Sequence, residues 1–313
     1  MRRRFDIVGV GYTALDYLGV VPRLPAEDGK LEIRDLTIQG GGPAATAMVA
    51  ARRLGASAAL VAKVGDDDFG RRMLDELRAE DVDCSSVAVE PGASSQFAFI
   101  MVNGSTASRT VLWTRGTVSR LRPDEVDLDL VGSARGLLVD DLEPEAALVA
   151  ARHARARGIP VLIDAGSLRD GVVELLPHCD YIFASERFAE RISGSSDPLA
   201  ALAALDAYGP KACGVTLGGR GCVALARGEV IEAPGFDVDA VDTTGAGDVF
   251  HAALLFAVLE GWDIERCCVF ANAVAALKCR RLGGRAGIPG FGEAVAFLGR
   301  ERPELDFTAR RIP

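Results

Sequence analysis

The stretch GLLVDDLEPEAALVAARHARARGIPVLID, residues 136–164, determines the fold class. An apolar run at Leu137–Val139 leads into an alanine-rich helical segment, Pro144–Arg157, and a second apolar run follows at Val161–Ile163. Parallel strands need a long crossover, usually a helix, whereas antiparallel strands can be joined by a tight turn. This stretch therefore predicts a βαβ unit, the building block of a parallel sheet.

The same alternation of short apolar runs and longer helical segments continues on both sides of this unit. Gly55 directly follows the first helical segment and is a typical helix stop. The expected strands are Phe5–Val10, Ala58–Val64, Leu137–Val139, Val161–Ile163, Tyr181–Ala184, Ala212–Leu217, Cys222–Ala226 and Glu229–Ala233, and the expected helices are Pro43–Leu54, Phe69–Glu80, Pro144–Arg157, Pro198–Tyr208, Ala246–Glu260, Ile264–Lys278 and Gly292–Leu298. This order predicts an α/β fold with a mostly parallel sheet flanked by helices.

Two parts of the chain do not follow this alternation and have the pattern of half-exposed strands instead. They are Leu15–Val21 with Leu31–Ile38, and Ser95–Val102 with Arg109–Trp113. The dipeptide Asn103-Gly104 between the last two runs is typical of a hairpin turn. We predict two β ribbons that form a small appendage, in the position of a lid or a dimer surface.

The composition is that of a globular protein and excludes several classes of function. Of 313 residues, 49% are hydrophobic and 25% are charged, and 35 basic against 44 acidic residues give a net charge of −9. This balance argues against nucleic acid as the main partner, because phosphate neutralisation needs clustered lysine and arginine. The longest apolar stretch, Val249–Leu259, is too short to span a membrane.

The seven cysteines show neither a C-x-x-C pair nor a zinc-binding spacing with the three histidines. The neighbours Cys267 and Cys268 lie in a helical stretch and are interpreted as core residues. We therefore expect free thiols and a cytoplasmic protein that binds small molecules rather than a membrane or nucleic acid.

The segment DTTGAGDVF, residues 242–250, is the strongest local signal for chemistry. A glycine-rich turn opens directly into an apolar helix, so backbone N–H groups and the positive end of the helix point at one place. Such an arrangement forms an anion hole for a phosphoryl group. Asp248 in the first helical turn has two interpretations. It compensates the helix dipole, or it takes a proton from a hydroxyl group that attacks phosphorus.

This segment resembles the C-terminal signature of the ribokinase-like (PfkB) family of carbohydrate kinases. Companion motifs are GGGPAATA at residues 40–47, followed by Leu54-Gly55, and VGDDDFG at residues 64–70. The resemblance covers nearly the whole chain. It implies one α/β kinase domain, residues 1–313, with a β-ribbon lid formed by residues 12–40 and 94–116. It also implies ATP-dependent phosphorylation of a primary hydroxyl group of a small sugar, with Mg²⁺ and a possible role for K⁺.

The resemblance also implies roles for individual residues. Asp248 would be the general base, the anion hole would be lined by Gly245, Ala246 and Gly247, and Arg109 would assist at the phosphoryl group. The sugar would be held by Asp16 and by the backbone of Gly41 and Gly42. The residues that match the ATP site of the family are Thr216, Gly218, Gly219, Gly221 and Asn272. The residues that match its monovalent-cation site are Asp242 and Thr244, with backbone of the 280–288 loop.

Taken singly, several of these residues have simpler explanations. Asp16 could be a solvated turn residue, Asn272 any polar residue on a helix, and Arg109 an exposed cross-strand partner. The glycines at 40–42 could form a bulge or lead into a helix. A G-x-G-x-x-A sequence at residues 9–14 imitates a dinucleotide fingerprint, but prolines and a β pattern follow it instead of the required helix.

The chain departs from the family pattern at informative positions. Thr46 replaces an asparagine that binds sugar in many members, and Ser185 and Phe188 replace the ends of an Asn-x-x-Glu motif that organises magnesium, so the magnesium contacts stay open. Several motifs resemble the sulfofructose kinase and ketohexokinase-like members, in which a lysine matching Lys30 holds the sulfonate. Trp113 and Leu142 stand where two further sulfonate contacts are expected. Sulfofructose and a neutral ketose stacked on Trp113 are both candidate substrates.

Two other functions stay open at this point. One is a nucleoside kinase of the same superfamily, and the other is a sugar-sensing protein that has the pocket but no turnover. The intact Asp248 and its glycines argue against the second. We also expect a homodimer formed through the exposed β surface of the lid.

Overall fold

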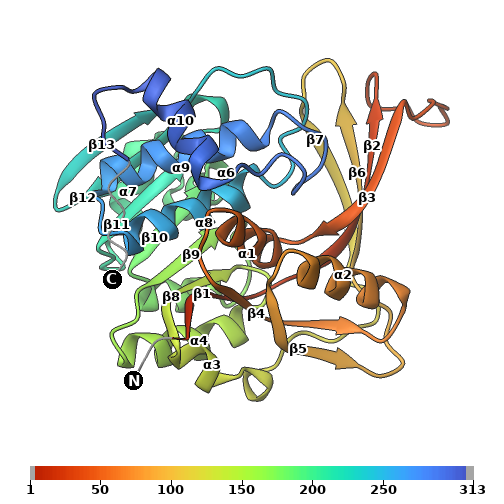
Figure 1. The fold of residues 1–313 in the computed structure, drawn as a ribbon, viewed down its shortest axis with the longest axis horizontal. Helices are drawn as coiled ribbons and strands as arrows, with labels where there is room; N and C mark the ends of the chain where they lie inside the picture. The colour runs from red at the N-terminus through yellow and green to blue at the C-terminus, as the bar shows by residue number, and fades with distance from the viewer. Residues whose placement is uncertain (1–3, 308–313) are drawn as a thin grey trace.

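The computed structural model describes residues 4–307, which form two β-sheets and flanking helices. The large sheet has nine strands in the order β13-β12-β11-β10-β9-β8-β1-β4-β5 (Figure 1). Its strands are β1 (Phe5–Val10), β4 (Ala58–Gly65), β5 (Asp83–Glu90), β8 (Ala134–Asp140), β9 (Val161–Ala165), β10 (Tyr181–Ser185), β11 (Ala212–Thr216), β12 (Gly221–Ala226) and β13 (Glu229–Pro234). The pairs from β5 to β11 are parallel, and only β12 and β13 are antiparallel additions at one edge.

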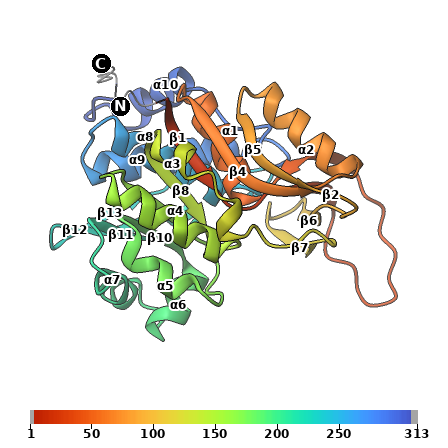
Figure 2. The ribbon, with the colours of Figure 1, turned by 90° about the horizontal axis from the view of Figure 1, so that it is seen from below.

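Helices cover both faces of this sheet, so the body has three layers (Figure 2). One face carries α1 (Pro43–Arg53), α2 (Asp68–Ala79), α8 (Ala246–Leu259), α9 (Ile264–Lys278) and α10 (Phe291–Glu301). The other carries α3 (Leu128–Gly132), α4 (Pro144–Ala156), α5 (Val172–Leu175), α6 (Glu186–Ser193) and α7 (Pro198–Asp206). The predicted α/β fold, with a mostly parallel sheet flanked by helices, is confirmed. No helix within residues 4–307 is long and apolar enough to cross a membrane.

The second sheet consists of the segments predicted to form a lid, is called the lid for that reason, and has four strands in the order β3-β2-β6-β7. These strands are β2 (Ala14–Val21), β3 (Asp35–Gly41), β6 (Phe97–Asn103) and β7 (Arg109–Thr114). The two ribbons that the sequence predicts are therefore one sheet, because β2 pairs in parallel with β6, with Leu15 opposite Phe97. The lid projects from one end of the body (Figure 1).

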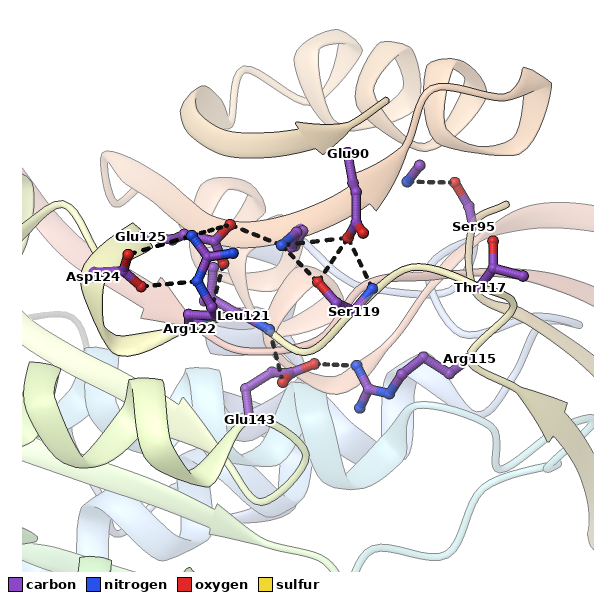
Figure 3. Close-up of polar contacts among 12 residues, drawn as sticks. Glu90, Ser95, Arg115, Thr117, Ser119, Leu121, Arg122, Asp124, Glu125 and Glu143 are labelled. Carbon is purple, nitrogen blue, oxygen red and sulfur yellow. Dashed lines mark hydrogen bonds and ion pairs between the residues drawn. The ribbon is translucent and has the colours of Figure 1, made fainter. Parts of the chain in front are cut away.

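A buried lysine fixes the segment that leads from the lid back to the body. The Lys63 amino group, at the end of β4, donates hydrogen bonds to Ser119 Oγ at 2.8 Å and to Glu125 Oε1 at 2.7 Å, and it lies 3.3 Å from Glu90 Oε2. Glu90 also accepts from the backbone and the hydroxyl of Ser119 (Figure 3). Charge-assisted bonds of this kind hold a loop firmly, so residues 115–125 give the lid a fixed root.

The buried carboxylate of Asp140 explains why glycine stands at position 11, within the stretch that imitates a dinucleotide fingerprint. Asp140 Oδ2 accepts from the backbone N–H of Tyr12 at 2.7 Å and of Ala44 at 3.2 Å, and Oδ1 accepts from Leu142 N at 3.0 Å. A side chain at Gly11 would collide with this carboxylate. The structure places β2 after β1, not a helix, so the rejection of the fingerprint is confirmed.

The sequence missed several elements. The largest is β5, which contains two serines and in which every apolar side chain is small or short, so it gives a weak strand pattern. It lies at the edge of the sheet. The short helices α3, α5 and α6 were also not predicted, because segments of four to eight residues carry little periodic signal. All seven cysteines are buried free thiols, as expected.

Candidate active site

The residues that carry chemistry gather at the carboxyl ends of the parallel strands. Asp141 follows β8, Asp164 lies near the end of β9, and Thr216 ends β11. Ligands of open α/β sheets bind at this edge. The start of α8 lies above it, and the lid sheet projects over the same end of the body (Figure 1).

The turn before α8 is held by Asp242, which is fully buried. Its Oδ1 accepts from the backbone N–H and the hydroxyl of Thr244, at 2.8 and 2.7 Å, and its Oδ2 accepts from Gly283 N at 2.7 Å. The Lys278 amino group, also buried, donates to the carbonyl of Asp242 at 2.9 Å. Asp242 and Thr244 are thus brought together as predicted, and Asp242 ties the turn to the 280–288 loop.

The N-terminus of α8 has the geometry of an anion hole. Gly245 has a φ of 76°, and a Cβ there would lie 2.9 Å from the carbonyl oxygen of Gly284, so only glycine fits. A Cβ on Gly247 would meet nothing within 4 Å, so open space lies in front of it. Ala246 N donates to Thr243 O at 3.2 Å and closes the turn. The first N–H groups of a helix lack intrahelical partners and favour an anion.

Asp248 lies in the first turn of α8, directly after these glycines. Burial and the nearby Asp164 carboxylate raise the pKa of Asp248 to about 6, against the opposing charges of Arg109, His251 and Lys278. A carboxylate with a pKa near neutrality is suited to general base catalysis, because it is ionised at pH 7 and basic enough to accept a proton.

The tip of the lid touches the turn that precedes the anion hole. Arg109, the first residue of β7, donates from Nη1 to Thr243 Oγ1 at 3.2 Å. The carbonyl of Ala107 accepts from the backbone N–H of Thr243 at 3.3 Å. Arg109 therefore lies beside the predicted phosphoryl site, although it is 139 positions away from Asp248 in the sequence.

One row of side chains crosses the face of the lid that carries Asp16. Asp16 of β2 pairs with Gln39 of β3 on one side and with Ala98 of β6 on the other, and Ala98 pairs with Trp113 of β7. Paired residues of neighbouring strands share a face of the sheet. Asp16 and Trp113 are two strand spacings apart, about 9–10 Å. The small side chain of Ala98 leaves room between them.

Asp16 is 6% exposed and lies against Gly41, where a Cβ would collide with the Asp16 carboxylate. Burial raises the pKa of Asp16 to about 7, although Arg285 opposes the shift. The charges of Asp248 and Asp242 act in the same direction as burial. Gly42 has a φ of 86°, a backbone conformation that favours glycine. The second glycine of the predicted pair is therefore required by the backbone.

Arg285 was not predicted as a site residue, and its buried guanidinium lies against the lid glycines Gly40 and Gly41. It is 5% exposed, donates from Nη2 to Gly41 O at 3.0 Å, and lies with Nε 3.4 Å from Thr46 Oγ1. Thr46 is itself 1% exposed on α1. The hydroxyl that replaces the family asparagine is thus engaged by an arginine from the 280–288 loop, and its contact with a sugar stays a prediction.

Trp113 is 48% exposed and forms an aromatic wall with Tyr12. The two rings meet edge to face at 6.1 Å, and the Arg169 guanidinium lies 5.5 Å from the centre of the Trp113 ring. Leu142 packs in the same apolar cluster as Tyr12. The two positions that were predicted to lack sulfonate contacts, Trp113 and Leu142, therefore both adjoin Tyr12. In contrast, Lys30 is exposed in the loop between β2 and β3, and its contact with a substrate stays a prediction.

The predicted nucleotide loop follows β11. Gly218 has a φ of 60°, and Cβ atoms on Gly218 or Gly219 would meet nothing within 4 Å, so their backbone faces open space. Gly221 has a φ of 90° and would collide with the carbonyl of Ala233 if it carried a side chain. Thr216 donates its hydroxyl to Ala184 O at 3.3 Å. These residues are brought together, and their contact with ATP stays a prediction.

Asn272 has a structural task in this region. Its side-chain amide nitrogen donates to the carbonyls of Ala233 and Pro234, at 2.9 and 3.3 Å, and so holds the end of β13 against α9. Asn272 is therefore more than a polar residue on a helix face, because its side chain is 7% exposed and its amide nitrogen donates two hydrogen bonds. Its place near an adenine stays a prediction.

The residues that stand in place of the magnesium motif are also engaged. Ser185 caps α6 by accepting from Phe188 N at 3.2 Å and donates to Gly166 O at 2.8 Å, and Phe188 is a core residue. Glu186 forms an ion pair with Arg220 of the nucleotide loop. Within the described part of the chain, no group of three or more His, Cys, Asp or Glu side chains is arranged to hold a metal ion.

Two further groups at the site were not predicted. Asp164 is 7% exposed, and its Oδ2 lies 3.3 Å from Nδ1 of His251, which is 2% exposed on α8. The signal for Asp164 was its position after an apolar strand. His251 stands one turn after the predicted anion hole, but the sequence does not show which residue it faces.

The fold and this site define an α/β phosphotransferase in which a β lid extends over a helix N-terminus. The chain matches the model of the pfkB family of carbohydrate kinases over residues 4–290 and belongs to that family. It is therefore a kinase. The ATP-dependent ribose-1-phosphate kinase of Halopiger xanaduensis is 31% identical over 93% of this chain and 97% of its own length.

Other similar proteins differ in the acceptor that their names give. The nucleoside kinase of Methanothermobacter thermautotrophicus is 28% identical over 93% of this chain and 94% of its own length. The solved structure of Arabidopsis thaliana ribokinase with ribose and ATP superposes with a TM-score of 0.80, at 24% identity, over 95% of this chain and 99% of that one. The latter likeness supports the fold, and the family membership supports the kinase activity.

Proposed function

We propose that the protein transfers the γ-phosphoryl group of ATP to a primary hydroxyl group of a small sugar, with Asp248 as the general base. One observation carries this proposal: Asp248 lies in the first turn of α8, directly after a glycine-rich turn with open space at Gly247, and Arg109 of the lid contacts the same turn. A carboxylate beside an anion site is suited to deprotonate a hydroxyl group that attacks phosphorus.

In this mechanism Asp16 and the Gly41 backbone orient the sugar. Asp248 accepts the proton of the hydroxyl as its oxygen attacks phosphorus. The N-terminus of α8, at Gly245 and Gly247, stabilises the negative charge of the phosphoryl group, and Ala246 joins it only if its N–H turns from Thr243 O to the ligand. Phosphoryl transfer needs little covalent chemistry from the protein, so positioning and electrostatics supply most of the rate.

Arg109 would supply a positive charge from the lid to the same place. It projects from the lid and its guanidinium already reaches the turn before the anion hole. When the lid lies over a bound sugar, this contact brings a cation to the transferred phosphoryl group, as arginines do in other phosphotransferases. The same lid contact excludes water, which would otherwise accept the phosphoryl group.

The donor would lie along the Gly218–Gly221 loop, where the backbone faces open space. Kinases of this family use ATP with Mg²⁺, which typically binds through substrate phosphates, waters and one or two carboxylates. Because Ser185, Phe188 and Glu186 are engaged elsewhere, we propose that the metal arrives with the nucleotide and is not organised by that segment. Asp242 and Thr244 with the 280–288 loop would hold a monovalent cation such as K⁺.

The acceptor pocket favours a neutral sugar ring over a sulfonated one. Trp113 offers exposed aromatic surface, and the buried Tyr12 and Leu142 support it from behind with an apolar cluster. A sulfonate needs several hydrogen-bond donors. The nearest arginines are already used, since Arg115 is paired with Glu143 and Arg169 lies 3.6 Å from Asp141. Sulfofructose, held through Lys30, is the second candidate.

A nucleoside is the alternative acceptor, because Trp113 could stack on a base as well as on a sugar. The similarity to the nucleoside kinase of Methanothermobacter thermautotrophicus supports this alternative. A sensor without turnover is less compatible with the site, since Asp248 and the glycines of its anion hole are intact.

An ADP-release assay with ATP, Mg²⁺ and K⁺ tests the proposal. The acceptors are fructose, tagatose, ribose, ribose 1-phosphate, 2-keto-3-deoxygluconate, sulfofructose and adenosine. We expect turnover with one neutral sugar and little with sulfofructose. Turnover with adenosine alone would establish the nucleoside alternative, and ATP binding without turnover on any acceptor would contradict the kinase mechanism.

We also propose that two lids form a homodimer. Leu36 and Leu112 are exposed by 53% and 57%, on the lid strands β3 and β7. Apolar side chains exposed in this way are typical of a contact surface. The mass in solution tests this: twice the mass of the chain is expected, and a monomer at micromolar concentration would contradict it.

A further inference from the structure

His251 occupies an unusual position between the anion hole and the sheet. Its Nδ1 lies 2.6 Å from the carbonyl oxygen of Gly247 and 3.3 Å from Asp164 Oδ2. Its Nε2 lies 3.0 Å from the carbonyl oxygen of Phe183 on β10. The ring is 2% exposed and stacks edge to face on Phe250. Three elements, α8, β9 and β10, therefore surround one imidazole.

All three polar neighbours of this ring are oxygen atoms that only accept hydrogen bonds. A neutral imidazole has one N–H donor and one lone pair, so either tautomer would place a lone pair of His251 against an oxygen lone pair. Such a contact is costly in a buried site. An imidazolium carries both N–H donors and satisfies Gly247, Phe183 and Asp164 together. Geometry alone thus selects the charged form.

The charges around this ring favour the same form. The Asp164 carboxylate raises the pKa of His251 to about 8, despite burial, which acts in the opposite direction. The Asp164 carboxylate in turn acts on Asp248, where it is the main charge that raises the pKa. The other charged groups that face this cluster are Asp141 after β8, Arg109 of β7, Lys278 of α9, Asp16 of β2 and Arg285 of the 280–288 loop.

We infer that His251 is an imidazolium at neutral pH in the resting enzyme, and that its pairing with Asp164 keeps the Asp248 carboxylate ionised for the phosphoryl transfer proposed above. His251 touches neither acceptor nor nucleotide in this role. It is a positioning residue that acts through Asp164: without its charge, an unpaired carboxylate would stand beside Asp248 and favour protonation of the base. The inference about Asp248 rests on the proposed function, whereas the charge state of His251 does not.

The charge state can be measured directly on the wild-type protein. The chain has three histidines, so ¹⁵N-labelled histidine gives a simple nitrogen spectrum, and single substitutions of His153 and His178 assign it. Burial and neighbouring arginines lower the pKa of those two histidines, so they serve as internal neutral references at pH 7. Two protonated ring nitrogens on His251 at pH 7 are expected. The shifts of a neutral tautomer would overturn the inference.

The effect on Asp248 is tested by the pH dependence of kcat/KM. Protonation of Asp248 removes the base, so activity falls below its pKa. His251→Asn keeps one amide donor but loses the charge, and it should raise the midpoint of this acidic limb by about one pH unit, a loss of about tenfold on the acidic side. Asp164→Asn combined with His251→Asn removes both charges and should return the midpoint toward the wild-type value. A purely structural role would lower kcat at every pH without moving the midpoint.

The two measurements separate the possible failures. An unchanged midpoint in folded His251→Asn, with an imidazolium seen in the nitrogen spectrum, would overturn the coupling to Asp248. If Asp248→Asn retained turnover, the proposed mechanism would fail while the nitrogen spectrum would still decide the charge of His251. If His251→Asn did not fold, the wild-type spectrum and the Asp164→Asn variant, whose midpoint should fall, would still test the inference.

Discussion

The two ends of the proposed active site are built in different ways. The phosphoryl end is one continuous segment, residues 242–248, in which the turn and the first helical turn of α8 bring the anion hole and Asp248 together. The acceptor end is a row of side chains from separate strands of the lid, with Asp16 and Trp113 on either side of Ala98. A local motif fixes the first end, whereas the second exists only after strands far apart in the sequence have paired.

This difference teaches where each part of the function is encoded. In the proposed mechanism, the chemistry depends on a segment that is held by Asp242 and by the positive φ of Gly245. The choice of acceptor would depend on lid residues that are not part of that segment. Changes at the phosphoryl end should therefore lower kcat, and changes at the acceptor end should raise KM.

The largest effect is expected at Asp248. Asp248→Asn removes the base but keeps the shape of the side chain, so kcat should fall by about 10²–10⁴-fold, while sugar and ATP still bind. Steady-state kinetics and calorimetry measure the two effects. Asp68→Asn is the matched control, since Asp68 is also a first-turn carboxylate, on α2, and is exposed. Retained turnover in Asp248→Asn would contradict the role of Asp248 as the general base at the phosphoryl end.

The next largest effect is expected at Gly41, where we propose that the lid meets the sugar. Gly41→Ala places a methyl group against the Asp16 carboxylate and displaces it. A displacement of this kind costs about 10²-fold in kcat/KM, mainly through KM. Gly292→Ala is the control, because a Cβ there meets nothing within 4 Å and alanine favours the helix. Equal effects of the two substitutions would contradict the role of the glycine.

A smaller effect is expected at Arg109, which connects the two ends. Arg109→Ala removes a charge-assisted contact, worth about 1.5–3 kcal/mol, from the phosphoryl group. We expect roughly a tenfold or larger loss in kcat with little change in the melting temperature. Arg122→Ala, an exposed arginine paired with Asp124, is the control. A loss confined to KM for the sugar would assign Arg109 to the acceptor end instead.

The smallest effect is expected at Trp113. Trp113→Ala removes aromatic contact with the sugar, and such contacts contribute about 0.5–1.5 kcal/mol beyond area burial. KM for the acceptor should rise roughly threefold to tenfold while kcat changes little. Thr110→Ala, on the opposite face of the same strand, should leave KM unchanged. A fall in kcat for Trp113→Ala with unchanged KM would show that the tryptophan does not hold the sugar.

The contrast also explains how much could be predicted from the sequence. The helix after the anion hole was predicted at Ala246–Glu260 and is observed at Ala246–Leu259, because a polar turn before an apolar run is a local signal. The single lid sheet was not predicted, because the pairing of β2 with β6 joins residues such as Leu15 and Phe97 that no short-range pattern connects.

The same limit applies to individual side chains. Asp248 could be singled out because its neighbours in the sequence are its neighbours in space. Arg285 could not, because its partners Gly41 and Thr46 belong to β3 and α1. His251 could not, because Asp164 comes from another strand. Residue type and position in a motif indicated that groups belong to the site, but not which charges they face.

The most direct test of the account is a crystal structure of the protein with its acceptor sugar and a non-hydrolysable ATP analogue. The account predicts that a primary hydroxyl of the sugar lies within hydrogen-bond distance of the Asp248 carboxylate, while Asp16 holds other hydroxyls and Trp113 covers the ring. A sugar bound away from Asp248, or an Asp248 side chain turned from both ligands, would contradict it.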